Sequence, residues 1–388
     1  MTEPFLGLTW DHPRGRRALE AASELWRDSG LDLTWHAQSL EGFESAPIAE
    51  LAERYDLLVL DHPHLGDALA SGCLRPMEEV VGEGVLAALS TRVVGPSLDS
   101  YRLGGFTWAL PLDAATQVSA CRPDLLTDVP ETWDDVIRVS HEVPVALSLS
   151  GPHAYLTFAS LCQSLGAPLA TGASAAIVDE SVGTEALQIL SDITTRSPQG
   201  AASQNPIGLL ERMTRTDEVA FIPLVYGYVG YADISRDRAV SFGPAPRGPE
   251  GHIGSTIGGT GIAVTARATV TDTLRRHLLW LLSDDVQTTF IPQNEGQPSL
   301  ATAWESERVN ASVGDFYRHT RGSIDRSWVR PRFEGFPATQ ARLSTAVRAG
   351  VVGGASAQDT LEQLTSIQNS AVKAAMGSRP RDNQGVGT

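Results

Sequence analysis

The tripeptide Asp-His-Pro occurs twice, as Asp11-His12-Pro13 and as Asp61-His62-Pro63, each time directly after an apolar run. Carboxylate and imidazole groups can hold the hydroxyls of a ligand, bind a divalent metal, or act as acid and base. The spacing matches no recognised metal motif, and Asp-His-Pro also forms a good turn after a strand. The residues therefore favour ligand hydrogen bonding or loop structure, with metal binding or catalysis as the alternative.

Both tripeptides follow segments that we expect to be strands, ending near Trp10 and Leu60. Between them, apolar residues at helical spacing predict a helix over residues 16–30, and alternation predicts a strand over 31–35. Strands separated by helices favour a parallel sheet with right-handed crossovers, so both loops should leave the same sheet edge. Ligands of open α/β sheets bind outside the carboxyl ends of strands. The two loops therefore predict one wall of a cleft.

Further along the chain, strands and helices alternate before helices dominate. Thr132 with Asp135 predicts a capped helix to about residue 142, and Ser356 with Asp359 predicts another capped helix. A buried strand is expected over 143–149, before the loop 150–153. Chain crossings between lobes are expected near 112–114 and before the strand 262–264. The polar, glycine-rich residues 377–388 predict a disordered tail.

Length and composition indicate a globular protein of two lobes. The chain has 388 residues, of which 42% are hydrophobic and 20% are charged. The formal net charge of -16 argues against nucleic acid or an anionic membrane as partner, because both favour clustered Lys and Arg. Three cysteines lack metal-like spacing, and two of them, Cys121 and Cys162, are expected to be small buried hydrophobes. No segment is long and apolar enough to predict membrane insertion.

The first residues lead directly into the first predicted strand. They contain no basic start, apolar core and small-residue cleavage site of the kind that a secretory signal needs. As it stands, the sequence predicts a cytoplasmic protein, and an extracytoplasmic one if a leader is missing.

The order of landmarks resembles the family 1 extracellular solute-binding proteins, the carbohydrate-binding components of ABC importers with the type II periplasmic-binding-protein fold. The likeness covers nearly the whole chain, and the number and order of the matching motifs make it specific. It rests on YDLLVLD at 55–61, GCLRPM at 72–77, GFTWALP at 105–111, PETWDDV at 130–136, GGTGIAV at 258–264, residues 278–290, and GQP at 296–298.

This resemblance implies an α/β fold of two lobes with an interlobe ligand cleft, hinge closure and a helical C-terminal region. The N-terminal lobe would comprise 1–112 and 262–303, and the C-terminal lobe 113–261 and 304–376. Small-molecule ligands, sugars or sugar acids, and ABC permease subunits would be the partners. The implied ligand-facing residues are Trp10, Asp11, His12, Arg14, Asp61, His62, His64, Asp113, Ser150, His153, Tyr226, Tyr228, Gly258 and Gly259.

Sugars are held by aromatic faces and by charged groups around their hydroxyls. Trp10, Tyr226 and Tyr228 are candidate platforms, although each aromatic could instead be core packing. Arg14 could bind the carboxylate of an acidic sugar or lie at the surface. Under this interpretation we expect no cofactor, metal or catalytic residue. The alternative is a cytoplasmic enzyme or ligand sensor on the same fold, using the Asp/His loops with or without a divalent metal.

Overall fold

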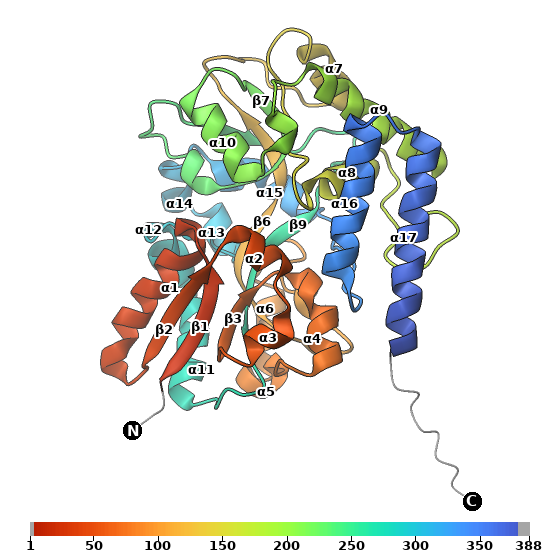
Figure 1. The fold of residues 1–388 in the computed structure, drawn as a ribbon. Coiled ribbons are helices and arrows are strands. Elements are labelled where there is room, and N and C mark those ends of the chain that lie inside the picture. The colour runs from red at the N-terminus through yellow and green to blue at the C-terminus, as the bar shows by residue number, and fades with distance from the viewer. Residues whose placement is uncertain (1–3, 379–388) are drawn as a thin grey trace, which may run out of the picture.

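The computed structural model describes residues 4–378, in which one mixed sheet runs through two lobes (Figure 1). The strand order is β2-β1-β3-β9-β6-β7, and β8 also pairs with β6. Strand β1 pairs in parallel with β2 and β3, which confirms the predicted parallel arrangement around the first two loops. The strands of this sheet are β1 (Phe5–Trp10), β2 (Leu33–Gln38), β3 (Leu57–Leu60), β6 (Leu110–Cys121), β7 (Phe221–Tyr226), β8 (Ser241–Gly243) and β9 (Ile257–Val264), while β4 (Arg102–Leu103) and β5 (Phe106–Thr107) form a separate pair.

The N-terminal lobe contains β1, β2 and β3 with their crossover helices. Helix α1 (Pro13–Trp26) follows β1 at once, and α2 (Leu40–Ser45), α3 (Ile48–Ala52) and α4 (Leu65–Ser71) lie near the ends of β2 and β3. Strand β3 is buried along its whole length. A core of apolar residues on each side of the sheet fixes these strands in place.

Strands β6 and β9 connect the lobes. Strand β6 is buried at every position, pairing with β9 along its first half and with β7 and β8 along its second half. The predicted boundaries at 112/113 and 261/262 fall inside these two strands, and the one at 303/304 falls inside α13 (Ala301–Glu305). The assignment of residues 1–112 and 262–303 to one lobe and 113–261 and 304–376 to the other remains a proposal.

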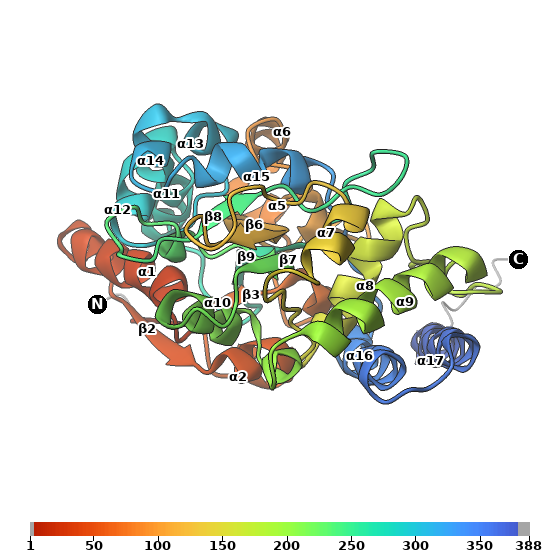
Figure 2. The same ribbon diagram turned by 90° about the horizontal axis from the view of Figure 1, so that it is seen from above.

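The C-terminal lobe is mainly helical. Helix α16 (Phe336–Val352) packs against α8 (His153–Ser164), α9 (Glu180–Arg196) and α17 (Ala357–Ser378), as the view from above shows (Figure 2). This lobe also holds α7 (Trp133–Val139) and α10 (Pro206–Arg215), and its core includes Cys121 and Cys162, which are buried as predicted. Between residues 4 and 378, no helix is long and apolar enough to cross a membrane.

Two sequence predictions at segment level need correction. The segment 143–149 is not a strand of the sheet and makes only an isolated bridge, between Val145 and Phe221, and Pro144 has no N–H with which to extend the pairing toward residue 143. The last helix continues to Ser378, so Gly377 and Ser378 are helical rather than part of the predicted tail. The rest of the predicted tail, 379–388, lies outside the described residues.

Candidate functional site

A cavity of about 70 Å³ lies where the loops after β1 and β3 meet α2, the first turn of α8, strand β9 and the segment before α16. Its walls therefore come from both lobes and from the strands that connect them. The predicted site residues that line it are Trp10, Arg14, Asp61, His64, His153, Tyr226, Tyr228, Gly258 and Gly259. The predicted residues that do not line it are Asp11, His12, His62, Asp113 and Ser150.

Arg14 and Asp113 form a buried ion pair at the back of the cavity. The Arg14 Nε and Nη2 atoms donate to the two Asp113 carboxylate oxygens at 2.6 and 2.5 Å, and Nη1 donates to the Gly227 carbonyl at 3.1 Å. Burial opposes the charge of the guanidinium, but the Asp113 carboxylate outweighs it and raises the pKa of Arg14. The two side chains therefore neutralise each other, and their contacts join α1, β6 and the loop after β7.

The first Asp-His-Pro loop builds the start of α1. His12 is the N-cap, its Nδ1 accepts a hydrogen bond from the Arg14 backbone N–H, and Pro13 occupies the first helical turn. The His12 ring stacks on Trp10 with centroids 5.1 Å apart, and burial lowers the pKa of His12 to about 4. Asp11 is exposed and pairs with Arg16. This loop therefore supports Trp10 and α1 rather than presenting Asp11 or His12 to the cavity.

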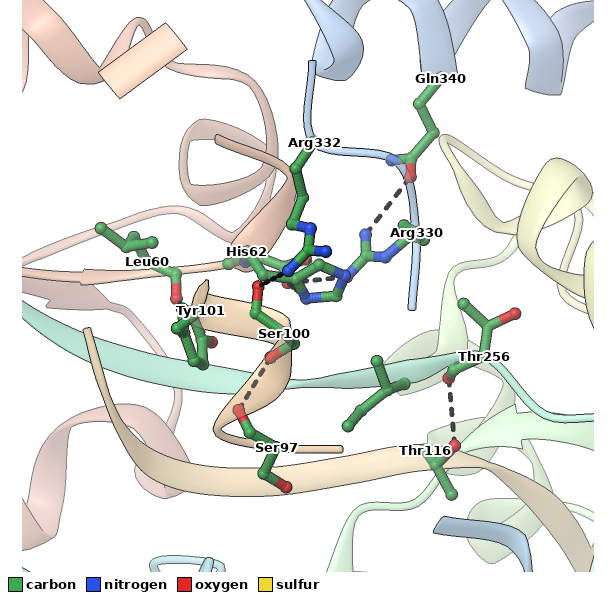
Figure 3. Close-up of polar contacts among 12 residues, drawn as sticks. Leu60, His62, Ser97, Ser100, Tyr101, Thr116, Thr256, Arg330, Arg332 and Gln340 are labelled. Atoms are coloured by element: carbon green, nitrogen blue, oxygen red, sulfur yellow. Dashed lines mark hydrogen bonds and ion pairs between the residues drawn. The ribbon is translucent and has the colours of Figure 1, made fainter. Parts of the chain in front are cut away.

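The second Asp-His-Pro loop carries an ion pair across the cleft. Arg330, in the segment before α16, donates from Nη2 to both Asp61 oxygens at 2.7 and 2.6 Å and from Nη1 to Gln340 Oε1 at 3.3 Å. Burial would raise the pKa of Asp61, but the Arg330 charge prevails and lowers it below its usual range. Figure 3 shows the Arg330 side chain between Gln340 and His62. The pair links the loop after β3 to the segment before α16.

His62 lies beneath that ion pair. Its Nδ1 is 3.1 Å from Asp61 Oδ1 without hydrogen-bond alignment, and its ring meets the edge of Tyr101, whose hydroxyl donates to the Leu60 carbonyl (Figure 3). Burial lowers the pKa of His62 to about 4. His62 is therefore uncharged and packs in the core of the protein.

Within residues 4–378, no group of three or more His, Cys, Asp or Glu could hold a metal ion.

Glu44 and His153 face each other across the cavity. Glu44 comes from α2 and His153 from the first turn of α8, and Glu44 Oε1 is 3.7 Å from His153 Nε2. Burial and the neighbouring Asp61 carboxylate raise the pKa of Glu44 to about 7. Burial and the Arg330 charge lower the pKa of His153 to about 3, and neither of its ring nitrogens has a hydrogen-bond partner among residues 4–378. His64, also buried, has its pKa lowered by burial.

Two glycines of β9, Gly258 and Gly259, make room for the aromatic and backbone groups beside them. A Cβ on Gly258 would lie 2.6 Å from the Tyr226 ring, so only glycine lets this ring rest on the strand. Gly259 has φ +94°, and a Cβ there would lie 2.4 Å from the Asp113 carbonyl. Tyr226 in turn meets the His153 ring, with centroids 6.0 Å apart.

Three charged or amide side chains of the cavity, those of Glu44, Arg330 and Gln340, were missed by the sequence prediction. Glu44 lies on a six-residue helix, and the other two lie far along the chain before and within α16. None belongs to a motif, and only the fold brings them to the loops after β1 and β3.

Comparisons with known proteins agree with this architecture. The model of the family described as bacterial extracellular solute-binding protein matches residues 38–288. A comparison with curated proteins finds no match.

Several solved structures share the fold. A solute-binding protein from Thermotoga lettingae bound to alpha-D-tagatose has a TM-score of 0.80 and 14% identity, covering 96% of this chain and 100% of that one. The GacH receptor of Streptomyces glaucescens, solved unliganded and with acarbose, has a TM-score of 0.79 and 15% identity, covering 96% and 99%. A ribitol complex from Agrobacterium radiobacter has a TM-score of 0.77 and 19% identity, covering 96% and 100%.

Proposed function

Because the chain belongs to the family of bacterial extracellular solute-binding proteins, we propose that it binds a carbohydrate between its two lobes as the binding component of an ABC importer. The observation that carries the proposal is the interlobe cavity, in which the Tyr226 ring lies among Glu44, His153 and Arg330. An aromatic ring can cover the C–H face of a sugar while charged groups around the ring bind the sugar hydroxyls, so this arrangement suits polyhydroxylated ligands. The neighbours bound to tagatose, ribitol and acarbose support this ligand class.

Binding requires the lobes to separate and close again. A cavity of about 70 Å³ is much smaller than the roughly 300–1,000 Å³ of most small-molecule sites. The Asp61–Arg330 pair is one contact between the two lobes, beside the hydrogen bonds from Arg332 to the carbonyls of Asp99, Ser100 and Arg102, while β6 and β9 run continuously between the lobes. We infer that the ligand enters when this pair breaks and that β6 and β9 form part of the hinge.

The geometry removes two imidazoles from the alternative of an enzyme or sensor that uses the Asp-His-Pro loops, while Asp61 and His64 of the second loop do line the cavity. His12 caps α1 and His62 packs on Tyr101, so neither imidazole reaches the cavity. ABC permease subunits are the protein partners that the proposed function requires.

A ligand panel tests the proposal. Mono- and disaccharides, hexitols, amino sugars and sugar acids are screened for a rise in Tm, and each hit is titrated by calorimetry. The expected result is saturable binding of one ligand per chain. Protein that is folded by circular dichroism yet binds no member of the panel would refute the carbohydrate proposal.

A further inference from the structure

The charged groups that line the cavity are unevenly balanced. Arg14 is neutralised by Asp113, and Arg330 by Asp61. Glu44 has no arginine or lysine within ion-pairing distance in the described part of the chain, and its Oε1 atom lies 3.7 Å from Nε2 of His153. A ligand that occupies the cavity therefore meets one acidic group without a basic partner.

The surroundings of Glu44 contain both signs of charge. Asp61 at the end of β3 and Glu41 on α2 oppose its ionisation, whereas Arg330 favours it. His153 on α8 is neutral, because burial lowers its pKa to about 3, and Tyr226 and Tyr228 are also neutral at pH 7, since burial raises their pKa values. Only Arg330 compensates, and its guanidinium already binds Asp61 and Gln340.

The neighbouring groups could accommodate the rest of a ligand. His153 is 5% exposed and lines the cavity, and in the part of the chain that the structure describes both of its ring nitrogens lack a hydrogen-bond partner. A buried polar group without a partner is costly, so a ligand hydroxyl at His153 would be stabilising. Phe43 and Tyr226 line the cavity near Glu44 and His153, and aromatic rings attract cations as well as the C–H faces of sugars.

We propose that the ligand carries a protonated amine beside its hydroxyls, as an amino sugar or an amino polyol does, and that Glu44 pairs with this amine. The inference rests on the proposed carbohydrate function and specifies its ligand class. An ammonium group supplies the positive charge that the lining lacks and donates to a carboxylate by charge-assisted hydrogen bonds. A neutral sugar offers Glu44 hydroxyl donors but no positive charge.

Calorimetry with matched ligand pairs tests the inference. Each amino sugar or amino hexitol is titrated beside its parent, in which a hydroxyl replaces the amine, at about pH 7.5, where a carboxyl with a pKa of about 7 is mostly ionised. The best amine is expected to bind roughly tenfold to a hundredfold more tightly than its parent, in the range of hydrogen bonds to charged groups.

Two variants assign the preference to Glu44. Glu44→Gln should abolish the amine preference, whereas Glu41→Gln, an exposed carboxylate on the same helix, should retain it. For wild type and an amine that stays protonated throughout this range, affinity should increase as the pH rises through about 7, because the ionised form of Glu44 is the one that binds.

The outcomes separate the two proposals. If the parent sugars bind as tightly as the amines, or if Glu44→Gln keeps the preference, the amine inference is wrong and carbohydrate binding stands. If the folded protein binds no sugar, hexitol or amine, both the proposed function and this inference are wrong.

Discussion

Removing the guanidinium of Arg14 should destabilise the fold strongly. The side chains of Arg14 and Asp113 are 6% and 7% exposed, and two short hydrogen bonds join Arg14 to Asp113 while a third of ordinary length joins it to the Gly227 carbonyl. Arg14→Met leaves the Asp113 carboxylate buried without a counter-ion. Breaking a buried pair from one side costs about 3–5 kcal/mol, so we expect a loss of that size in the free energy of unfolding.

Urea denaturation followed by circular dichroism measures this loss, with the transition midpoint and slope fitted separately. Arg16→Met is the matched control on the same helix, because its partners Asp11 and Glu20 are exposed, and it should change stability little. Adding Asp113→Asn to Arg14→Met should recover part of the loss, because the uncompensated charge is removed. A loss below about 1 kcal/mol for Arg14→Met, or no recovery in the double variant, would refute the reasoning.

Two further perturbations probe the other contacts around the cavity. Arg330 lowers the pKa of Asp61, so the contribution of Asp61 to the free energy of unfolding is present above the usual carboxyl pKa and is lost as the pH falls through the pKa that Asp61 has in the folded protein. The free energy of unfolding of Asp61→Asn should therefore depend less on pH in the acid range than that of wild type. Parallel pH profiles for the two proteins would contradict the ion pair. Gly259→Ala should lower the free energy of unfolding by about 1–3 kcal/mol, because φ is +94° and the new methyl group meets the Asp113 carbonyl. The control is Gly84→Ala, since Gly84 has open space around it. Equal melting curves for the two variants would contradict this strain.

Local signals in the sequence predicted much of the fold. The caps at Thr132 and Ser356 form as expected, each with a hydrogen bond from the N–H of the aspartate three residues on. The apolar runs before the two Asp-His-Pro loops form the parallel strands β1 and β3. These features depend on neighbours in the chain, so periodicity and capping chemistry suffice to predict them.

The site was less predictable, because its members lie far apart in the sequence. Arg14 and Asp113 were interpreted as separate ligand contacts, yet they bind each other across 99 positions. Arg330 pairs with Asp61 across 269 positions, and no local pattern around Arg330 indicates this partner. His62 follows Asp61 directly, but the turn after β3 buries its ring. Such long-range pairings follow from tertiary packing and cannot be read from the spacing of residues.

Calorimetric titration of a carbohydrate hit against wild type and Tyr226→Ala tests the central claim most directly. Tyr226 lies on the cavity wall beside Gly258, and loss of an aromatic anchor costs about 1–3 kcal/mol of binding free energy. Phe106→Ala, which removes an exposed ring on β5 (Phe106–Thr107), is the matched control. We predict one site per chain, affinity reduced about tenfold or more in Tyr226→Ala, and unchanged affinity in Phe106→Ala. Full wild-type affinity in folded Tyr226→Ala would contradict binding between the lobes.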